Sequence, residues 1–264
     1  MTRLFLAVLL LCGSARAAPG LLDVLTPAGR PPLTLPDAYR DAVLALNPSA
    51  YWILGEGAGV DAADQTGNYP ATYVNGPTLG FAGIVPASPA TCVDFTDGVT
   101  NQYVTAGTIN LTSAYSVVVW QQCDSQSEYR PMVSCLRIPA PTYDGWVFDI
   151  DLATGAARWT SCNASACDVF TGKTDVVTGG TFMVAITGSG VSASIYVGGS
   201  VDNSTATAKV MPLGIVGTYT FLGAREDTGS TDYAWDGRLA HVAVWNGTTL
   251  APAQIQGLAT AAGL

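Results

Sequence analysis

The sequence predicts an all-β fold, an antiparallel sandwich or barrel, and three observations support this prediction. Apolar and polar residues alternate along several short segments, as in strands that bury one face. Turn signals rich in Gly, Asn and Asp separate these segments, and no helical stretch intervenes. The 264 residues are 48% hydrophobic and 12% charged, with 29 Gly and 15 Pro, a composition that favours strands and turns around a large core.

The first 17 residues have the pattern of a signal peptide. Arg3 supplies the positive end, residues 4–11 form an apolar run, and Ala-Arg-Ala at 15–17 fits a cleavage site between small residues. This run is too short to cross a bilayer core of about 30 Å, and no later segment is long and apolar enough. We therefore expect an exported chain without a transmembrane anchor, and the alternative is an uncleaved N-terminal strand or arm.

A folded domain is expected over residues 36–264, after a linker or arm at 18–35 that Pro and Gly interrupt. A short helix should begin near Pro36, with Thr34 as a possible cap and Asp37 in its first turn. The Asn-Pro pair at 47–48 should end this helix, because the residue before proline avoids the α conformation. The chain then runs directly into an aromatic-rich first strand.

The strand and turn pattern continues from residue 50 to residue 245. Alternation is clearest in five segments: 115–122, 145–152, 181–188, 192–199 and 218–224. A last short helix is expected from Pro252 to Ala262, with Ile255 and Leu258 on its buried side.

The charge balance argues against nucleic acid as a partner. The formal net charge is −9, and lysine occurs only at positions 173 and 209. So few cations cannot form the basic surface that phosphate backbones require.

The cysteines predict disulfides, which agrees with export. Cys162 and Cys167 flank a four-residue loop and could close a small ring. Cys123 and Cys135 lie on either side of a polar turn, in two segments that look like paired strands, so a second disulfide is expected there. Cys92 is left over and is interpreted as an inert core thiol. The chain has no CxxC pair and one histidine, a poor basis for a zinc site.

Four Asn-x-Ser/Thr motifs occur at positions that look like turns or strand edges. In an exported protein they predict N-glycosylation at Asn110, Asn163, Asn203 and Asn246.

Several segments together resemble one known family. The segments are "AYRDAVLALNPSAYWILGEG" (38–57), "DQTGNYPATYVNG" (64–76), "CVDFTDGVTNQYVTAG" (92–107), "LTSAYSVVVWQQC" (111–123), "SIYVGGSV" (194–201) and the closing block 221–258. In this order they resemble the laminin-G-like, concanavalin A-like jelly-roll domains of secreted and phage or viral proteins, over residues 36–262. The resemblance implies an antiparallel jelly-roll β-sandwich with a short N-terminal and a short C-terminal helix.

The chain departs from the family pattern at two places. Residues 237–242, "GRLAHV", lack the usual acidic pair, and the strand "VVVWQQC" has lost an acidic position. If these acidic residues have a role in relatives, we do not expect this chain to share that role.

Some families with this fold hydrolyse glycosides, which requires two closely placed carboxyl groups. Glutamate occurs only at 56, 128 and 226, far apart in the sequence. Asp149 and Asp151 should share one strand face, either as a catalytic pair or as part of an exposed face with Phe148 and Ile150 packed inward. We adopt the second interpretation and expect no catalysis. The lone His241 is interpreted as a surface or satisfied core residue.

Binding chemistry is more plausible than catalysis. Sandwich lectins often hold Ca²⁺ in acidic loops, and Asp64, Asp97 and Asp236 are candidate ligands. Asp64 and Asp97 are equally explained as turn residues that bond to nearby backbone.

Sugar recognition generally needs exposed aromatic rings beside polar groups. The candidate ligand-binding residues are Tyr129, Asp232, Tyr233 and Trp235. Trp146 and Trp159 fall in alternating strands, where core packing is at least as plausible.

These observations predict a secreted or surface-exposed, non-catalytic carbohydrate-binding or adhesion module. Its partner would be a glycan or a protein of a cell or virion surface. The alternative is a structural component of a virion or extracellular coat, and the third hypothesis is a glycoside hydrolase.

Overall fold

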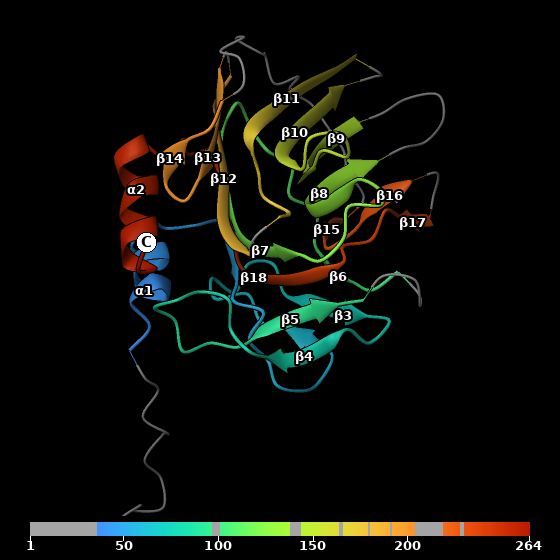
Figure 1. The fold of residues 1–264 in the computed structure, drawn as a ribbon, viewed down its shortest axis with the longest axis vertical. Helices are drawn as coiled ribbons and strands as arrows, with labels where there is room; N and C mark the ends of the chain where they lie inside the picture. The colour runs from blue at the N-terminus through green and yellow to red at the C-terminus, as the bar shows by residue number, and fades with distance from the viewer. Residues whose placement is uncertain are drawn as a thin grey trace, which may run out of the picture. The chain divides into compact units, whose positions relative to one another are not determined.

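The computed structural model describes residues 36–96, 101–137, 144–163, 166–178, 180–190, 192–203, 219–227 and 230–264. In this part of the chain, two antiparallel sheets pack face to face as a sandwich (Figure 1). The predicted all-β jelly-roll sandwich with one short helix near each end is confirmed. The predicted signal peptide, 1–17, and linker, 18–35, lie outside the described residues.

The first sheet, sheet A, contains the long strand of the closing block, β18 (Gly237–Asn246). In spatial order it consists of β14 (Ser200–Val201), β13 (Ala193–Val197), β12 (Thr181–Ser189), β7 (Ala114–Cys123), β18 (Gly237–Asn246), β5 (Cys92–Phe95) and β4 (Thr78–Phe81), and β1 (Ala50–Trp52) also pairs with β18.

The second sheet, sheet B, contains the strands between β7 and β12. In spatial order it consists of β11 (Ala166–Asp175), β10 (Ala156–Asn163), β9 (Asp144–Ile150), β8 (Arg130–Arg137), β15 (Thr220–Leu222), β6 (Tyr103–Ala106), β3 (Ala71–Val74) and β2 (Asp61–Ala62). A separate hairpin, β16 (Arg225–Asp227) and β17 (Ser230–Asp232), follows β15 and lies beside β8.

The main core fills the space between the sheets, and alternation along each strand decides which residues enter it. In β9, Trp146, Phe148 and Ile150 point into the core, and Val147 and Asp149 therefore point outward. The Trp146 and Trp159 rings stack at 5.4 Å between centroids within this core. These two tryptophans are therefore core residues.

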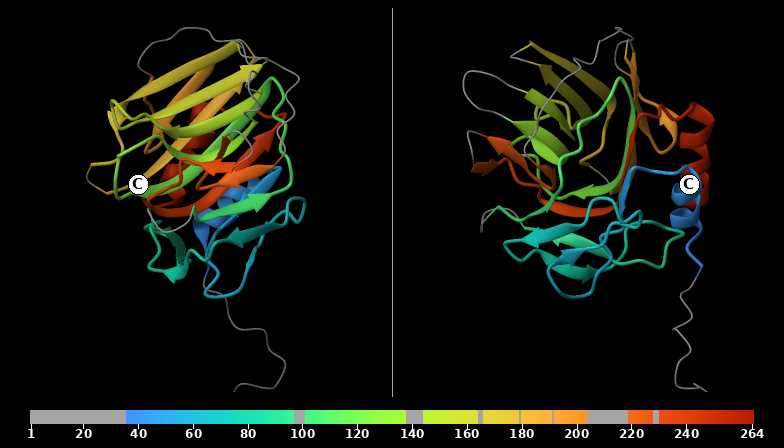
Figure 2. Two further views of the ribbon diagram at one scale, coloured as in Figure 1. Left: turned by 90° about the vertical axis from the view of Figure 1, so that its right-hand side faces the viewer. Right: turned by 180° about the vertical axis from the view of Figure 1, so that it is seen from behind.

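The two helices cover the outer face of sheet A. α1 (Ala38–Ala45) and α2 (Pro252–Ala261) form a second apolar cluster with the outward side chains of that sheet, including Trp120 and Trp245. Figure 2, seen from behind, shows both helices on one side of the sandwich, away from β8–β11. Ile255 and Leu258 of α2 are buried as predicted. The outer face of sheet A is thus committed to packing.

The start of α1 differs from the prediction. Asp37, rather than Thr34, is the N-cap, because its carboxylate accepts a hydrogen bond from the Arg40 amide at 2.9 Å. The helix ends as expected, since Asn47 has a φ of +51° just before Pro48.

One predicted disulfide forms and the other does not. Cys162 and Cys167 are bonded across the β10–β11 turn. The predicted Cys123–Cys135 bond is wrong, because β7 belongs to sheet A and β8 to sheet B, so the two strands do not pair. The Cys123 thiol instead donates to the Ser125 carbonyl at 3.1 Å. Cys92 is a buried thiol, as expected.

Within the described residues, neither helix has the length and apolar character needed to cross a membrane.

Candidate functional site

A cavity of about 200 Å³ lies on the outer face of sheet B, opposite the helices. Strands β8 to β11 supply its floor, and the hairpin β16–β17 and the residue before β8 supply one wall. The lining residues are Tyr129, Leu136, Val147, Arg158, Thr160, Cys162, Cys167, Val169 and Arg225. Val169 is 48% exposed, so the cavity opens to solvent.

Two arginines and two tyrosines alternate in a row along this wall, and Tyr233, at the end of the row, is not one of the residues that line the cavity. The Arg158 guanidinium carbon lies 4.0 Å from the centre of the Tyr129 ring. The Arg225 guanidinium carbon lies 4.0 Å from the Tyr233 ring centre and 5.9 Å from the Tyr129 ring centre. The ring centres of Tyr129 and Tyr233 are 6.1 Å apart. Cation–π contacts therefore hold both rings in place while leaving them half-buried.

A buried arginine positions Tyr233. Arg130 is fully buried and donates to the Ala234 carbonyl at 2.7 Å, and the Trp235 amide donates to the Gly223 carbonyl at 2.7 Å. These bonds hold the chain on the C-terminal side of Tyr233, whose φ of +56° is unusual for a residue other than glycine. Such an enforced backbone is common where a side chain is held for a ligand.

An ion pair lies beneath the aromatic wall. Arg158 and Asp149 are direct cross-strand partners, with Nε–Oδ1 at 2.8 Å and Nη2–Oδ2 at 2.5 Å. Burial raises the pKa of Asp149, although the hydrogen bonds and charge of Arg158 oppose this. Burial lowers the pKa of Arg158, but the hydrogen bonds and charge of Asp149 outweigh it and leave that pKa above its ordinary value. Arg158 is thus held as a cation by its partner.

The expected exposed face around Asp149 is therefore corrected. Phe148 and Ile150 do pack inward, but Asp149 is 0% exposed because Arg158 covers it. Asp151 lies 3.7 Å from Arg158, and its Oδ1 accepts hydrogen bonds from the Ala153 and Thr154 amides. Both carboxylates are engaged in local structure.

The structure brings together two of the four predicted ligand-binding residues. Tyr129 and Tyr233 lie on the same wall, as described above. Trp235 is wrong as a surface residue, because it is 0% exposed and belongs to the core between the sheets. The side chain of Asp232 lies outside what the structure describes.

Asp64 does not fit a calcium ligand. Its two carboxylate oxygens accept five hydrogen bonds, from the amides of Tyr51, Thr66, Asn68 and Tyr69 and from the Thr66 hydroxyl. These donors occupy the lone pairs that a cation would need. The turn interpretation of Asp64 is confirmed.

The other two predicted calcium ligands are Asp97 and Asp236. Asp97 lies outside the described residues. The Asp236 backbone carbonyl accepts a hydrogen bond from the Asp124 amide at 2.9 Å. Within the described ranges, no three His, Cys, Asp or Glu side chains gather as metal ligands would.

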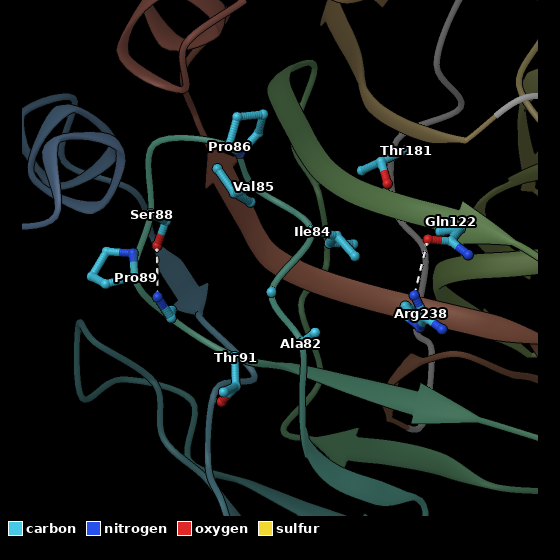
Figure 3. Close-up of a pocket in the computed structure, with 12 residues that line it drawn as sticks. Ala82, Ile84, Val85, Pro86, Ser88, Pro89, Thr91, Gln122, Thr181 and Arg238 are labelled. Atoms are coloured by element: carbon cyan, nitrogen blue, oxygen red, sulfur yellow. Dashed lines mark hydrogen bonds between the residues drawn. The ribbon is translucent and has the colours of Figure 1, made fainter.

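A second cavity, of about 500 Å³, lies beside the loop 82–91 (Figure 3). Figure 3 shows Arg238 and Gln122 joined on one side, with the loop on the other. Arg238 also pairs with Asp94 at 3.3 Å and stacks on the Phe81 ring at 4.0 Å. Its charge is therefore already matched, which makes this cavity a weaker candidate than the one on sheet B.

The lone histidine is buried in a hydrogen-bonded chain. The Tyr51 hydroxyl lies 2.6 Å from His241 Nδ1, His241 Nε2 lies 3.2 Å from the Ser88 hydroxyl, and Ser88 donates to Asp37 at 2.6 Å. Burial lowers the pKa of His241 to about 4. In a catalytic triad the histidine bonds to the carboxylate. Here the Ser88 hydroxyl bonds to Asp37 instead, and no His241–Asp37 hydrogen bond forms, so Ser88 is not aligned as a nucleophile activated by a His–Asp pair. The interpretation of His241 as a satisfied core residue is supported.

The predicted glycosylation sites differ in exposure. Asn110 is exposed, and Asn163, Asn203 and Asn246 are half-buried. The Asn246 amide is engaged at both ends, since Nδ2 donates to the Asn110 carbonyl and Oδ1 accepts from the Thr112 amide.

Sequence reasoning missed Arg158, Thr160 and Arg225. The alternation in β9 and β10 does place Asp149, Arg158 and Thr160 on outward faces. The pairing register that makes Arg158 the partner of Asp149, and the hairpin that brings in Arg225, could not be obtained from alternation.

Comparison with known proteins gives one family match. The model of Laminin_G_3, described as the concanavalin A-like lectin/glucanases superfamily, matches residues 97–256. A search of curated protein sequences finds no match to this chain.

Solved structures share the fold at low identity. Domain 4 of AbnA, a GH43 extracellular arabinanase from Geobacillus stearothermophilus, solved with arabinotriose, has a TM-score of 0.58 and 16% identity; the match covers 80% of this chain and 98% of that domain. A second structure comes from work on botulinum neurotoxin type C, whose cell entry depends on interaction with two ganglioside molecules. It has a TM-score of 0.60 and 13% identity, and the match covers 83% of this chain and 52% of that chain. Trypanosoma rangeli sialidase bound to 2,3-difluorosialic acid has a TM-score of 0.57 and 13% identity, with coverage of 81% and 32%. The chain thus spans nearly all of the arabinanase domain but about a third of the sialidase chain.

Proposed function

Since the chain belongs to the concanavalin A-like lectin/glucanase superfamily, we propose that it is a non-catalytic carbohydrate-binding module that holds a sugar on the outer face of sheet B. The observation that carries the proposal is the cavity that Tyr129, Arg225 and strands β8–β11 line. It combines the fixed Tyr129 ring, which can pack on the apolar face of a sugar, with polar groups that can bond its hydroxyls.

The size of the cavity and one of its hydroxyl groups support this proposal. A volume of about 200 Å³ is smaller than the ~300–1,000 Å³ of typical ligand pockets, which suits a single sugar residue better than a long chain. The Thr160 hydroxyl oxygen on the floor is buried and has no protein hydrogen-bond partner. A sugar hydroxyl would satisfy it, and buried polar groups without partners are costly.

The structural neighbours support the same class of ligand. The arabinanase domain, whose full length matches, was solved with arabinotriose, and the neurotoxin structure was reported with an interaction with gangliosides. At 16% identity or less these structures share only the fold, so the likeness favours a carbohydrate ligand without naming it.

Two observations favour binding without catalysis. Glycoside hydrolysis needs one carboxyl group as an acid and a second as a base or nucleophile. Asp149 is held in a buried bidentate pair with Arg158, and Asp151 bonds to the turn that follows β9. Neither carboxylate lines the cavity.

We also propose that residues 1–17 direct export and that the sequon asparagines are glycosylated where exposed. The Cys162–Cys167 bond supports an oxidising compartment. Asn110 is the best acceptor of the four, because its side chain is exposed and the Asn246 amide is engaged. N-terminal sequencing and glycopeptide mapping of the protein secreted from the full-length chain would test both proposals.

A glycan array probed with the secreted protein tests sugar binding. Wild type should bind a defined class of glycans, and Tyr233→Ala should weaken that binding by roughly 30-fold, equivalent to ~2 kcal/mol. Tyr219→Ala is the matched control, because Tyr219 is 53% exposed and, unlike Tyr233, does not stack on an arginine that lines the cavity. Trp235 is unsuitable as a probe, since its replacement would damage the core.

Two results would oppose the proposal. If a folded wild-type protein bound no glycan, carbohydrate binding would be excluded, and a protein partner on a virion or cell surface would become the better hypothesis. If Tyr233→Ala and Tyr219→Ala bound equally well, the site would lie elsewhere on the sandwich.

A further inference from the structure

The charges that line the sheet B cavity suggest which sugars it accepts. Its charged lining residues are Arg158 and Arg225, and the described lining contains no Asp or Glu. Among the described lining residues, a ligand in this cavity therefore meets two cations and the Tyr129 ring, and no carboxylate.

The two arginines differ in how their charges are matched. Arg158 forms the bidentate pair with Asp149 on the floor of the site. Among the described side chains, no carboxylate lies within ion-pair distance of Arg225. The Arg225 guanidinium instead lies over the Tyr233 ring, and its Nε is buried without a hydrogen-bond partner.

From this arrangement we infer that the cavity selects an acidic sugar, with Arg225 binding its anionic group, Tyr129 packing against its ring and Tyr233 holding Arg225 in place. This inference rests on the proposed sugar-binding function. The planar guanidinium presents paired N–H donors that match the two oxygens of a carboxylate or a sulfate. Thr160 is then placed to bond a hydroxyl of the same residue.

The whole-molecule charge makes the recognition local. The chain carries a formal net charge of −9, so its long-range field repels an acidic ligand. Affinity must therefore come from short-range contacts inside the cavity, where a charge-assisted hydrogen bond is stronger than at an open surface. Removing one such contact should have a large effect on acidic ligands and a small effect on neutral ones.

The test compares matched glycans on the same array: acidic glycans with a terminal carboxylate, their carboxyl-reduced neutral counterparts, and sulfated counterparts. Wild type should bind the acidic member of a pair at least roughly tenfold more tightly than the reduced member. Arg225→Gln should remove this preference while retaining binding of the neutral sugar. Arg225→Lys, which keeps the charge but loses the fork, should retain part of it. The sulfated arm shows whether carboxylate or sulfate is the preferred source of the charge.

The matched control is Arg40→Gln on α1, a partly exposed arginine on the far side of the sandwich, which should leave the preference unchanged. Circular dichroism of each variant confirms folding, and the lysine variant provides the test if the glutamine variant does not fold. Equal binding of acidic and neutral sugars, both lost in Tyr233→Ala, would overturn this inference and leave the proposed function standing. A preference for acidic sugars that survives in Arg225→Gln would also overturn it. If the folded wild-type protein bound no sugar, both this inference and the proposed sugar-binding function would be refuted.

Discussion

At the residue scale, most of the polar groups that looked reactive in the sequence serve local structure. Asp64 organises a turn through five hydrogen bonds, and Asp37 caps α1 while bonding to Ser88. Asp149 neutralises Arg158. Among the described residues, Arg225 at the sheet B cavity has no carboxylate within ion-pair distance and stacks on Tyr233 instead.

His241 should make stability depend on pH. Burial lowers its pKa from 6.5 to about 4 in the folded protein, against the opposing charge of Asp37. Between pH 6.5 and pH 4 the unfolded chain binds a proton that the folded chain does not, so the free energy of unfolding falls as the pH falls. Urea titrations at pH 7 and pH 4.5 should show wild type losing roughly 2 to 3 kcal/mol more than His241→Gln does. Identical losses in both proteins would contradict this assignment.

The Asp149–Arg158 pair should be far more important than a surface pair. Asp149→Asn removes the buried bidentate partner of Arg158 and leaves only the more distant Asp151, at 3.7 Å, and we expect a loss of about 3 kcal/mol in the free energy of unfolding. Asp41→Asn is the matched control, because Asp41 pairs with Arg40 at 2.8 Å but its side chain is 61% exposed, and its loss should stay below about 1 kcal/mol. Urea unfolding at pH 7 measures both, and similar losses would refute the distinction.

At the element scale, strand partners decide the role of each segment. The segments of β7 and β8 are consecutive and look like a hairpin, yet β7 pairs with β12 and β18, and β8 pairs with β9 and β15. A bulge in β18 between Ala240 and Ala243 similarly places His241, at a φ of +49°, against the Tyr39 and Tyr51 rings on the helix side of sheet A. Simple alternation does not give either result.

The cysteine assignment can be checked by peptide mapping. Non-reducing digestion should recover a Cys162–Cys167 linked peptide and no Cys123–Cys135 peptide. Burial raises the thiol pKa of Cys92 to about 11 and that of Cys123 to about 12, so alkylation of both should require denaturant. Rapid labelling of either thiol in the native protein would disagree with the structure.

Gly145 should be essential to the pairing of β8 and β9. Its φ is +130°, and a Cβ there would overlap the Cys135 carbonyl oxygen, so we expect Gly145→Ala to cost about 3 kcal/mol or more. Gly247→Ala isolates the backbone contribution, because Gly247 also has a positive φ of +94° but open space around it, and it should cost ~1 kcal/mol. Chemical denaturation compares them, and equal costs would show that the overlap is relieved.

At the scale of the whole molecule, the two outer faces of the sandwich have different tasks. The outer face of sheet A is covered by α1 and α2, and the outer face of sheet B carries the cavity. Stability and binding should therefore respond to different residues. The helices near both ends of the described chain pack on the fold, and the middle strands with the hairpin before β18 form the proposed site.

Leu258→Ala and Tyr233→Ala should separate these tasks. Leu258 in α2 is buried, so its truncation should cost about 2 to 5 kcal/mol and lower the melting temperature by several degrees. Sugar affinity of the folded Leu258→Ala protein should stay at the wild-type level. Tyr233→Ala should keep the melting temperature near that of the wild type and lower the sugar affinity. Calorimetry measures the melting temperature and the glycan array measures the affinity. A loss of affinity in both variants would mean that the faces are coupled.

Much of the candidate site was beyond prediction from sequence. Tyr129 and Tyr233 were identified because aromatics beside polar turns are candidates for exposure, and the structure places them 6.1 Å apart. Trp235 met the same criterion and is in the core, since only the path of the chain after Tyr233 decides which way it points. Arg158 and Arg225 carried no local signal, because an arginine acquires a role from its neighbours in space.

The sequence by itself determined the sandwich, because alternation, turn chemistry and the helix-ending Asn47-Pro48 pair are local properties of the chain. It also identified the Cys162–Cys167 bond, whose partners are five residues apart. Only the tertiary structure decided strand register, the sheet to which each strand belongs, the buried Asp149–Arg158 pair and the Arg225–Tyr233 wall. Each of these depends on contacts between segments distant in sequence, and their energies come from burial and pairing that no local pattern contains.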